Sequence, residues 1–364
     1  MLHLPMKAII TAGGRGTRMR PLTFSINKHL IPLANKPLIF YAIETIAKAG
    51  IKEIGINYNP GQLEELESVL GDGSKWGVKL TYFLQEKPLG LANIIQEAQD
   101  FVGKEKFLMH LGDNIFWGGI KELLDYFLKE KFNALAPVIH HPENWRMGVP
   151  YFDKKGQLKR YVEKPKNPPH DLAVPGLYFF DHHVFECFSG RDAIKPSARG
   201  EFEIGSLYEC LIKKNYRVGT KEFKGVWKDP GKFDDWLDTN QFLLDATVKN
   251  ETQSKLGKGV KTEGRVTIGK KCKIENSLLR GPIIIGDEVE IKNSFIGPYS
   301  SIGDQCEILD ARIGNSILLK GVKIIHPGKS IDSSLIGQET VIQNSGQNWD
   351  NLELFVGNQC IVEL

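Results

Sequence analysis

The sequence predicts an α/β domain followed by a parallel β-helix. Two observations lead to this prediction: short apolar runs alternate with helical patterns in the first part, and apolar residues then recur every 17 positions. A glycine-rich loop directly after the first apolar run is a third observation, because such loops bind phosphate groups. The 364 residues are too many for one ordinary core. We therefore expect two domains, residues 1–248 and 259–364.

Alternating strands and helices define the first domain. Apolar or β-branched runs predict strands at residues 8–12, 54–58, 78–84 and 107–111. Leu38, Ala42, Ile46 and Ala49 predict a helix that ends at Gly50, and Leu63, Leu66, Val69 and Leu70 predict a second one. This alternation is typical of a largely parallel, Rossmann-like sheet with helices on both faces, a three-layer arrangement. Ligands of such sheets bind at the carboxyl ends of the strands.

A repeat of 17 residues defines the second domain. Three apolar columns per repeat predict three flat sides per coil, which is the triangular parallel β-helix of hexapeptide type. The columns are Ile268, Ile285, Ile302, Leu319 and Ile336; Leu279, Ile296 and Ile313; and Ile274, Ile291, Ile308, Ile325 and Ile342. Polar residues 249–261 mark the junction between the domains. Residues 343–350 are predicted to form a loop, and residues 352–364 a final strand pair that caps the coil.

Composition excludes several classes of protein. A net charge of +3 is too small to indicate nucleic-acid binding, and no apolar run approaches the ~20 residues of a membrane span. Five cysteines without a C-x-x-C pair indicate reduced thiols and a cytoplasmic protein. The adjacent pairs His140-His141 and His182-His183 do not have the spacing of metal ligands.

The loop after the first strand has the composition of a triphosphate site. Gly13, Gly14 and Gly16 allow backbone N–H groups to approach an anion, and Arg18 and Lys28 follow. The spacing excludes a P-loop, which needs Lys-Ser/Thr after its last glycine. It also excludes a dinucleotide fingerprint, because a methionine replaces the third glycine and a proline interrupts the helix.

The run from residue 7 to 37 resembles the N-terminal signature of the sugar-1-phosphate nucleotidylyltransferases, G-G-x-G-T-R-x-x-P-x-T followed by K-x-x-x-P. Later blocks are similar in the same order. They are Gln85-Glu86-Lys87-Pro88-Leu89-Gly90-Leu91-Ala92, Leu111-Gly112-Asp113-Asn114, Glu163-Lys164-Pro165, Arg199-Gly200-Glu201 and Trp227-Lys228-Asp229-Pro230-Gly231. Within this family, the sequence is most similar to the long thymidylyltransferases, which carry a left-handed β-helix. It implies transfer of a nucleotidyl group from dTTP to α-D-glucose 1-phosphate, with Mg²⁺, in deoxysugar biosynthesis.

The resemblance assigns roles on the nucleotide side. Ala12, Gly13 and Gly14 would bind the nucleotide, and Gln85 and Gly90 would contact the pyrimidine edge. Arg18 would neutralise the departing pyrophosphate, and Lys28 would reach the α-phosphate. Without the resemblance, Gln85 would be an ordinary amide at the end of a strand.

The resemblance also assigns the metal and the sugar. Asp113 and Asp229 would hold Mg²⁺, which takes few protein ligands beside phosphate and water. Taken singly, these two residues would be a helix N-cap and a turn former. On the sugar side, Glu163 would accept bonds from hydroxyls, Lys164 and Arg199 would hold the phosphate, and Gly148 and Val174 would offer backbone contacts. Ile204-Gly205-Ser206 departs from a common Ile-Thr-Asp in the family.

Three alternatives remain open. The first is a close relative that uses UTP or GTP, of the UDP-glucose or GDP-mannose type. The second is an added acyltransferase in the β-helix with His326 as its base, against the simpler interpretation of His326 as a coil corner. The third is a non-catalytic relative, which intact Arg18, Lys28, Asp113 and Asp229 disfavour. We expect the β-helix to support a homo-oligomer.

Overall fold

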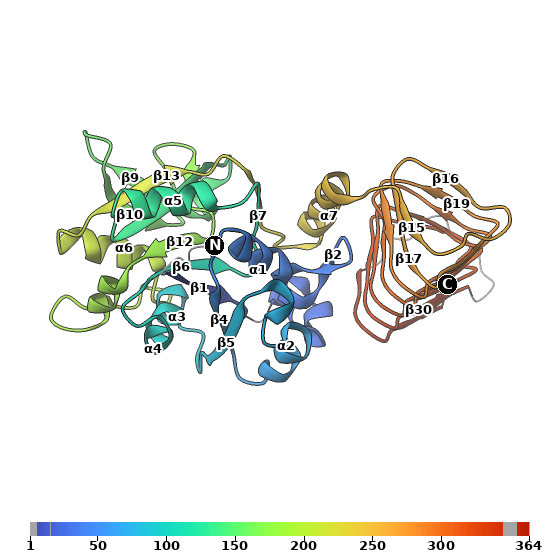
Figure 1. Cartoon of the computed structure of the whole chain (residues 1–364), viewed down its shortest axis with the longest axis horizontal. Coiled ribbons are helices and arrows are strands. Elements are labelled where there is room, and N and C mark those ends of the chain that lie inside the picture. The colour runs from blue at the N-terminus through green and yellow to red at the C-terminus, as the bar shows by residue number, and fades with distance from the viewer. Residues whose placement is uncertain (1–5, 15, 345–354, 364) are drawn as a thin grey trace. The chain divides into compact units, whose positions relative to one another are not determined.

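The chain folds into two compact units, which the computed structural model describes for residues 6–14, 16–344 and 355–363 (Figure 1). The first unit contains residues 1–14 and 39–228. The second contains residues 15–38 and 229–364. The segment 15–38, which carries the predicted Arg18 and Lys28, is therefore part of the unit that holds the β-helix. The predicted domain division at residues 248–259 stays a prediction.

A mixed sheet forms the centre of the first unit. Its strand order is β11-β8-β12-β6-β1-β4-β5, with β13 beside β8. The four strands predicted from the sequence are β1, β4, β5 and β6, and they pair in parallel as expected. The strands are β1 Met6–Thr11, β4 Glu53–Tyr58, β5 Lys79–Leu84, β6 Lys106–Leu111, β8 Ala134–His140, β11 Leu172–Ala173, β12 Leu177–Phe180 and β13 Val218–Glu222.

Helices connect these strands, and the two predicted ones are confirmed. The first predicted helix is α1, and it ends before Gly50 with a φ of 98°. The second is α2, and Gly71 ends it with a φ of 63°, a conformation that glycine adopts without strain. The α-helices are α1 Leu38–Lys48, α2 Leu63–Leu70, α3 Leu91–Glu97, α4 Gln99–Val102, α5 Lys121–Lys129 and α6 Ile204–Lys213. Short 3₁₀ helices are η1 Thr17–Met19, η2 Leu22–Phe24, η3 Lys28–Leu30, η4 Ser74–Trp76, η5 Asn144–Arg146 and η6 His182–Phe188.

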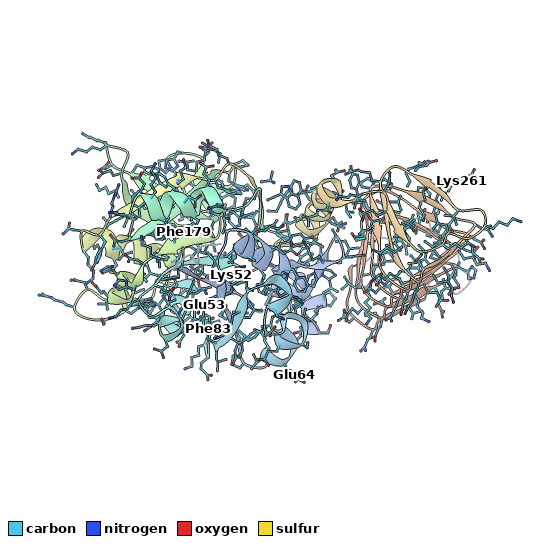
Figure 2. All side chains as sticks on the ribbon, in the orientation of Figure 1. Lys52, Glu53, Glu64, Phe83, Phe179 and Lys261 are labelled. Atoms are coloured by element: carbon cyan, nitrogen blue, oxygen red, sulfur yellow. A yellow bond between two sulfur atoms is a disulfide. The ribbon has the colours of Figure 1, made fainter. Side chains whose placement is uncertain are left out.

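The core of the first unit lies between the sheet and its helices. Phe179 of β12 (labelled in Figure 2) is fully buried and contacts Phe127 of α5. Ile95 of α3 and Leu207 of α6 belong to a second buried cluster with Phe107 of β6. Apolar faces of helices on a hydrophobic sheet are the stable arrangement for an alternating chain. The predicted Rossmann-like α/β domain is thus confirmed.

The prediction of reduced thiols was wrong for one pair. Cys187 of η6 and Cys210 of α6 form a disulfide, with their Cα atoms 6.0 Å apart. Their separation of 23 residues in sequence gave no signal, because the contact arises only when η6 packs on α6. An odd total number of cysteines does not exclude a single bridge. Cys272, Cys306 and Cys360 remain free thiols.

The second unit contains the predicted β-helix. Three parallel sheets form its sides, with stacked residues Ile274 and Ile291 on one and Leu279 and Ile296 on another. Outward positions such as Lys261 (Figure 2) are exposed. Each sheet adds one strand per coil, which fits the left-handed hexapeptide type. The strands are β15 Glu251–Gln253, β16 Lys261–Glu263, β17 Val266–Lys270, β18 Lys273–Glu275, β19 Leu278–Arg280, β20 Ile283–Ile285, β21 Glu290–Lys292, β22 Phe295–Ile296, β23 Ser301–Ile302, β24 Glu307–Leu309, β25 Arg312–Gly314, β26 Ile317–Leu318, β27 Lys323–Ile325, β28 Ser330–Asp332, β29 Leu335–Ile336, β30 Val341–Gln343, β31 Phe355–Val356 and β32 Ile361–Glu363.

The strict 17-residue repeat was wrong in one coil. Leu318, and not Leu319, stacks between Ile302 and Ile336. In the same coil Ile324 replaces Ile325 in the next column, so Ile325 points away from the core. Between Ile313 and Leu318 the chain is one residue shorter than in the preceding coil, and between Ile324 and Ile331 it is two residues longer. The step from Ile331 to Ile336 is again one residue short, and this restores the register. Because side chains alternate along a strand, a shift by one residue exchanges the inner and outer faces.

Two short strands end the chain, as predicted, but they do not pair with each other. β31 pairs with β29 and β32 pairs with β30, so both extend existing sheets by another coil. The predicted loop at residues 343–350 lies outside the described residues from residue 345 onwards. The two strands are therefore confirmed, their pairing with each other was wrong, and the cap itself stays a prediction.

Candidate active site

Several predicted residues follow parallel strands of the first unit. Gly13 follows β1, Gln85 follows β5, and Asp113 follows β6, so all three lie beyond the carboxyl ends of their strands. Strand β4 separates β1 from β5. This edge of a parallel sheet is where ligands of such folds bind.

The backbone of the glycine loop is held by Asn57 at the end of β4. Its Oδ1 atom accepts hydrogen bonds from the N–H groups of Ala12 at 2.9 Å and Gly13 at 3.4 Å. A Cβ atom at Gly13 would lie only 2.3 Å from Oδ1 of Asn59. A side chain at position 13 would therefore force the Asn59 amide to move.

Gln85 is almost fully buried at the end of β5. Its Nε2 atom donates to Oδ1 of Asn93 at 2.9 Å and to the carbonyl oxygen of Gly90 at 3.4 Å. The chain around Gly90 is held by Phe202, whose carbonyl oxygen would lie 2.7 Å from a Cβ atom at position 90. Gly90 has a φ of 101°, which also favours glycine. The two residues predicted to contact the base are thus in contact with each other.

Asp113 is held by a side chain that the sequence prediction missed. Asn114 donates from Nδ2 to Oδ1 of Asp113 at 2.9 Å, and its Oδ1 accepts from the indole N–H of Trp227 at 2.8 Å. An indole N–H only donates, so the amide of Asn114 is oriented with its N–H groups toward the carboxylate. Trp227 belongs to β14 Val226–Lys228, which pairs with β7 Ile115–Trp117. Asp229 follows β14 directly.

The predicted sugar residues of the first unit come together around β9 Gly148–Phe152 and β10 Leu158–Glu163. Glu163 is paired with Gly148 in this antiparallel ribbon. Val174 bridges to Gly148 from the other side, and its N–H donates to the Gly148 carbonyl oxygen at 2.9 Å. Lys164 follows Glu163 with a φ of 50° and donates its N–H to Met147. Three residues that are distant in sequence thus form one backbone cluster.

A buried tyrosine explains two glycines near this cluster. A Cβ atom at Gly148 would lie 1.9 Å from the hydroxyl oxygen of Tyr161, and one at Gly205 would lie 2.3 Å from its ring. The departure from the family pattern at position 205 therefore has a packing reason, because only glycine leaves room for this ring. The Tyr161 ring also stacks on Tyr208 with centroids 5.7 Å apart.

Charges of both signs surround Glu163. Burial raises the pKa of its carboxyl group; Lys164 opposes this shift, and Glu203 adds to it. The Nζ atom of Lys164 lies 3.9 Å from Glu163, and the guanidinium of Arg199 bonds Glu203 at 2.8 Å. Arg199 also interacts electrostatically with Glu163. The predicted sugar-phosphate cations therefore lie beside carboxylates.

The remaining predicted residues belong to the second unit. Arg18 is in η1 and Lys28 is in η3, where Lys28 is buried. A Cβ atom at Gly231 would lie 3.1 Å from Nη1 of Arg18, so Arg18 approaches the turn that carries Asp229. Gly16 has a φ of 52° and packs against Thr23 and the stem of Lys28. Asn27 caps η3 through a bond from the His29 N–H at 2.9 Å.

His326 is a corner residue of the β-helix. It has a φ of 45°, and its Nδ1 atom lies 3.1 Å from a carboxylate oxygen of Asp310. Asp310 in turn accepts from Asn293 at 3.1 Å, and Asn276 follows in the same ladder. All four residues have positive φ values, which marks a corner repeated from coil to coil. The ladder favours the corner interpretation over that of an acyltransferase base.

Within the described ranges, no group of three or more His, Cys, Asp or Glu side chains has the arrangement of a metal site. Any metal would therefore need ligands beside protein carboxylates. Each helix described is too short or too polar to cross a lipid bilayer.

The sequence prediction missed the asparagines that hold the site. Asn57, Asn93 and Asn114 bind backbone or side chains of predicted residues. One signal was available: Asn57 and Asn114 stand at or just after the end of an apolar strand, where a buried amide must find a partner. Asn93 carried no such signal, because it lies inside a helix.

Known proteins resemble this chain over most of its length. Residues 7–246 match the Nucleotidyl transferase family. A glucose-1-phosphate thymidylyltransferase from Streptomyces griseus is 35% identical over 340 residues, which are 93% of this chain and 94% of the relative. A low-salt glycan biosynthesis nucleotidyltransferase from Haloferax volcanii is 39% identical over 240 residues, 66% of each chain.

A solved structure also matches. It is a Bacillus anthracis protein assigned as a glucose-1-phosphate thymidylyltransferase, in complex with sucrose, with a TM-score of 0.60 and 33% identity. The match covers 65% of this chain and 94% of that one. The family match, the near full-length relative and the fold agree. The chain therefore belongs to the nucleotidyl transferase family.

Proposed function

We propose that this enzyme transfers a thymidylyl group from dTTP to α-D-glucose 1-phosphate, giving dTDP-glucose and pyrophosphate. The observation that carries the proposal is the cluster of Gly148, Glu163 and Val174, which the chain assembles from three separate segments. A cluster of backbone groups and one carboxylate suits the hydroxyl groups of a hexose. The relative from Streptomyces griseus bears the name of this activity.

On the nucleotide side, Ala12, Gly13 and Gly14 bind the triphosphate through the loop after β1. Gln85 and Gly90 contact the pyrimidine. Arg18 neutralises the departing pyrophosphate with its planar guanidinium, and Lys28 stabilises charge on the α-phosphate. The burial of Lys28 supports this role, because a lysine that is held in place loses little freedom on binding.

On the sugar side, Glu163 accepts hydrogen bonds from hydroxyl groups, and Lys164 and Arg199 bind the phosphate. Gly148 and Val174 contribute backbone contacts. The attacking oxygen is an oxygen of the sugar phosphate, so no protein nucleophile is needed. Catalysis then depends on positioning and charge neutralisation.

We propose Asp113 and Asp229 as the protein ligands of Mg²⁺. Carboxylate oxygens are hard donors, and two of them beside phosphate oxygens and water suit this ion. The bond from Asn114 fits the role, since metal-binding carboxylates are commonly oriented by a further hydrogen bond. When bound, Mg²⁺ would neutralise charge on the phosphate oxygens.

Pyrophosphate release with dTTP, glucose 1-phosphate and Mg²⁺ tests the proposal. The wild type should be active, and Asp113→Asn should lose at least 100-fold in kcat. Asp125→Asn is the matched control, because Asp125 is an exposed carboxylate on α5 that pairs only with Lys121 among the described residues. Equal loss in both variants, or no turnover by the wild type with dTTP, would contradict the proposal. Chelation by EDTA should abolish activity and added Mg²⁺ should restore it.

The second candidate is the same reaction with UTP. Thymine and uracil present the same imide edge, and a methyl group is worth only ~1–3 kcal/mol in a tolerant pocket. Parallel kcat/KM values for dTTP, UTP and GTP decide between them.

We further propose a cytoplasmic homo-oligomer, in which the β-helix provides the packing surface. Because two of the cysteines form a disulfide, reduced thiols no longer support a cytoplasmic location. We propose the cytoplasm for a different reason, which is that nucleoside triphosphates are made inside cells. Sedimentation analysis of the full chain tests the oligomeric state.

A further inference from the structure

Three side chains form a hydrogen-bonded row that fixes the direction of the Gln85 amide. Nε2 of Gln85 donates to Oδ1 of Asn93 at 2.9 Å. Nδ2 of Asn93 donates to the carboxylate of Glu97 at 3.3 Å. Asn93 and Glu97 are four residues apart on α3 and therefore lie on the same face of that helix.

The direction of this row cannot be reversed. The Glu97 carboxylate only accepts hydrogen bonds, so Asn93 must present its N–H groups to it and its oxygen to Gln85. The Gly90 carbonyl oxygen, 3.4 Å from Nε2 of Gln85, also only accepts. A flipped Gln85 amide would place its oxygen against both acceptors. Gln85 and Asn93 are only 4% and 5% exposed, so water cannot relieve such a clash.

The row leaves the Oε1 atom of Gln85 without a donor among the described residues. We propose that Asn93 and Glu97 are positioning residues that keep this oxygen available as an acceptor for the ring N–H of thymine or uracil, and that they thereby exclude cytosine. The proposal rests on the proposed function, since it assumes that Gln85 contacts the base.

The chemistry of the bases makes this orientation selective. Thymine and uracil carry a hydrogen on N3, which can donate to Oε1. Cytosine carries a lone pair on N3, which would meet the lone pairs of Oε1. A site built to bind one N–H group rejects an analogue that lacks it far more strongly than it rejects a change of one methyl group. A Gln85 amide free to turn would accept either base.

The test compares kcat/KM for dTTP and dCTP, two nucleotides with the same sugar and phosphates. We expect the wild type to prefer dTTP by at least 100-fold. Asn93→Leu should lower this ratio at least tenfold, because Gln85 can then flip. The double variant Asn93→Asp/Glu97→Gln should keep the ratio within about threefold, because the new carboxylate still accepts from Nε2 of Gln85 and the new amide can donate to it. Gln96→Ala, an exposed change on the same helix, is the control.

The ratio of the kcat/KM values for dTTP and dCTP distinguishes a loss of Gln85 orientation from a general loss of stability. A variant that is only destabilised loses activity with both nucleotides equally. Dissociation constants for dTTP and dCTP from calorimetry, measured without sugar phosphate, give the same ratio without turnover. The proposal is overturned if Asn93→Leu keeps the wild-type ratio or if the double variant Asn93→Asp/Glu97→Gln falls as far as Asn93→Leu. If the wild type does not use dTTP, the proposed function fails, and the orientation is then judged by the same variants with UTP and CTP.

Discussion

The Oδ1 atom of Asn240 accepts a hydrogen bond from the backbone N–H of Ala34 over 2.9 Å. The same oxygen accepts from the hydroxyl of Ser301 at 2.8 Å, and Nδ2 donates to the Tyr299 carbonyl oxygen at 3.2 Å. Asn240 lies on α7 Phe233–Thr247 and is fully buried. One side chain therefore joins α7, the β-helix and the segment that carries Lys28.

Replacing Asn240 should affect both stability and activity. Asn240→Leu leaves a buried N–H, a carbonyl and a hydroxyl without partners, and we expect a loss of about 3 kcal/mol in the free energy of unfolding. The kcat should fall because the segment with Lys28 loses its support. Urea unfolding and pyrophosphate release measure the two effects. Gln241→Ala, which loses a single bond to Asn315, is the control and should cost about 1 kcal/mol. If Asn240→Leu changes neither the free energy of unfolding nor kcat, this interpretation is wrong.

Replacing Trp227 should weaken Mg²⁺ binding, although this side chain cannot bind the ion itself. Trp227→Phe keeps an aromatic ring and removes the N–H that orients Asn114 beside Asp113. Loss of such an outer hydrogen bond typically weakens metal binding by roughly 10- to 100-fold. The Mg²⁺ concentration for half-maximal activity should rise by about that factor, with kcat recovering at high Mg²⁺. Trp145→Phe, at an exposed tryptophan, should leave it unchanged. An unchanged Mg²⁺ dependence in Trp227→Phe would exclude this role.

His110 should make the fold sensitive to mild acid. Burial lowers the pKa of His110 to about 4, although its bond to the Leu111 carbonyl opposes the shift. In the unfolded chain its pKa is near 6.5. Between these values the unfolded state binds a proton that the folded state does not, so stability falls as the pH drops from about 6.5 to 4.

The expected loss for His110 is about 2 kcal/mol between pH 7.5 and pH 5. Urea unfolding of the wild type and of His110→Phe at both pH values measures it, and the variant should lose less. His182→Gln, at an exposed histidine, should behave like the wild type. If wild type and His110→Phe lose equal stability, His110 is not the group responsible.

The disulfide should stabilise the first unit. It joins residues 23 positions apart, and a loop of this length contributes about 3 kcal/mol in the chain-entropy account. Reduction by dithiothreitol should lower the melting temperature of the wild type. Cys210→Ser should show the lower value with and without reductant, whereas Cys360→Ser should respond like the wild type. A melting temperature that is insensitive to reductant would contradict the bridge in solution.

The sequence predicted the elements whose residues repeat at a regular spacing. The strand at residues 107–111, the helix that ends at Gly50 and the three apolar columns all depend on side-chain periodicity, and they were confirmed except for one coil. That coil was missed because Leu318 and Leu319 are both apolar, as are Ile324 and Ile325. Either member of each pair could face inward. Only the stacking of neighbouring coils decides between them.

The candidate site was predicted through motifs, and the side chains that support it were not. Gly148, Glu163 and Val174 were expected to act together, and they do lie together. Asn93 and Asn240 belong to no motif, and the motif that contains Asn114 gave this residue no role, because the roles of all three depend on contacts between distant segments. The same reason hid the bridge between Cys187 and Cys210. Contacts of this kind depend on the packing of whole elements, which no local pattern contains.

The second unit combines an early and a late part of the chain, and this affects the order in which the protein folds during synthesis. Residues 15–38 belong with residues 229–364, yet a ribosome makes them much earlier. At ~5–20 residues per second, the segment waits on the order of ten to forty seconds for its packing partners. During that interval Leu33, which is buried in the finished protein and lies on β2 Pro32–Leu33 against α7, does not yet have α7 as a partner. The segment that carries Arg18 and Lys28 is therefore among the last parts of the chain to reach its final form.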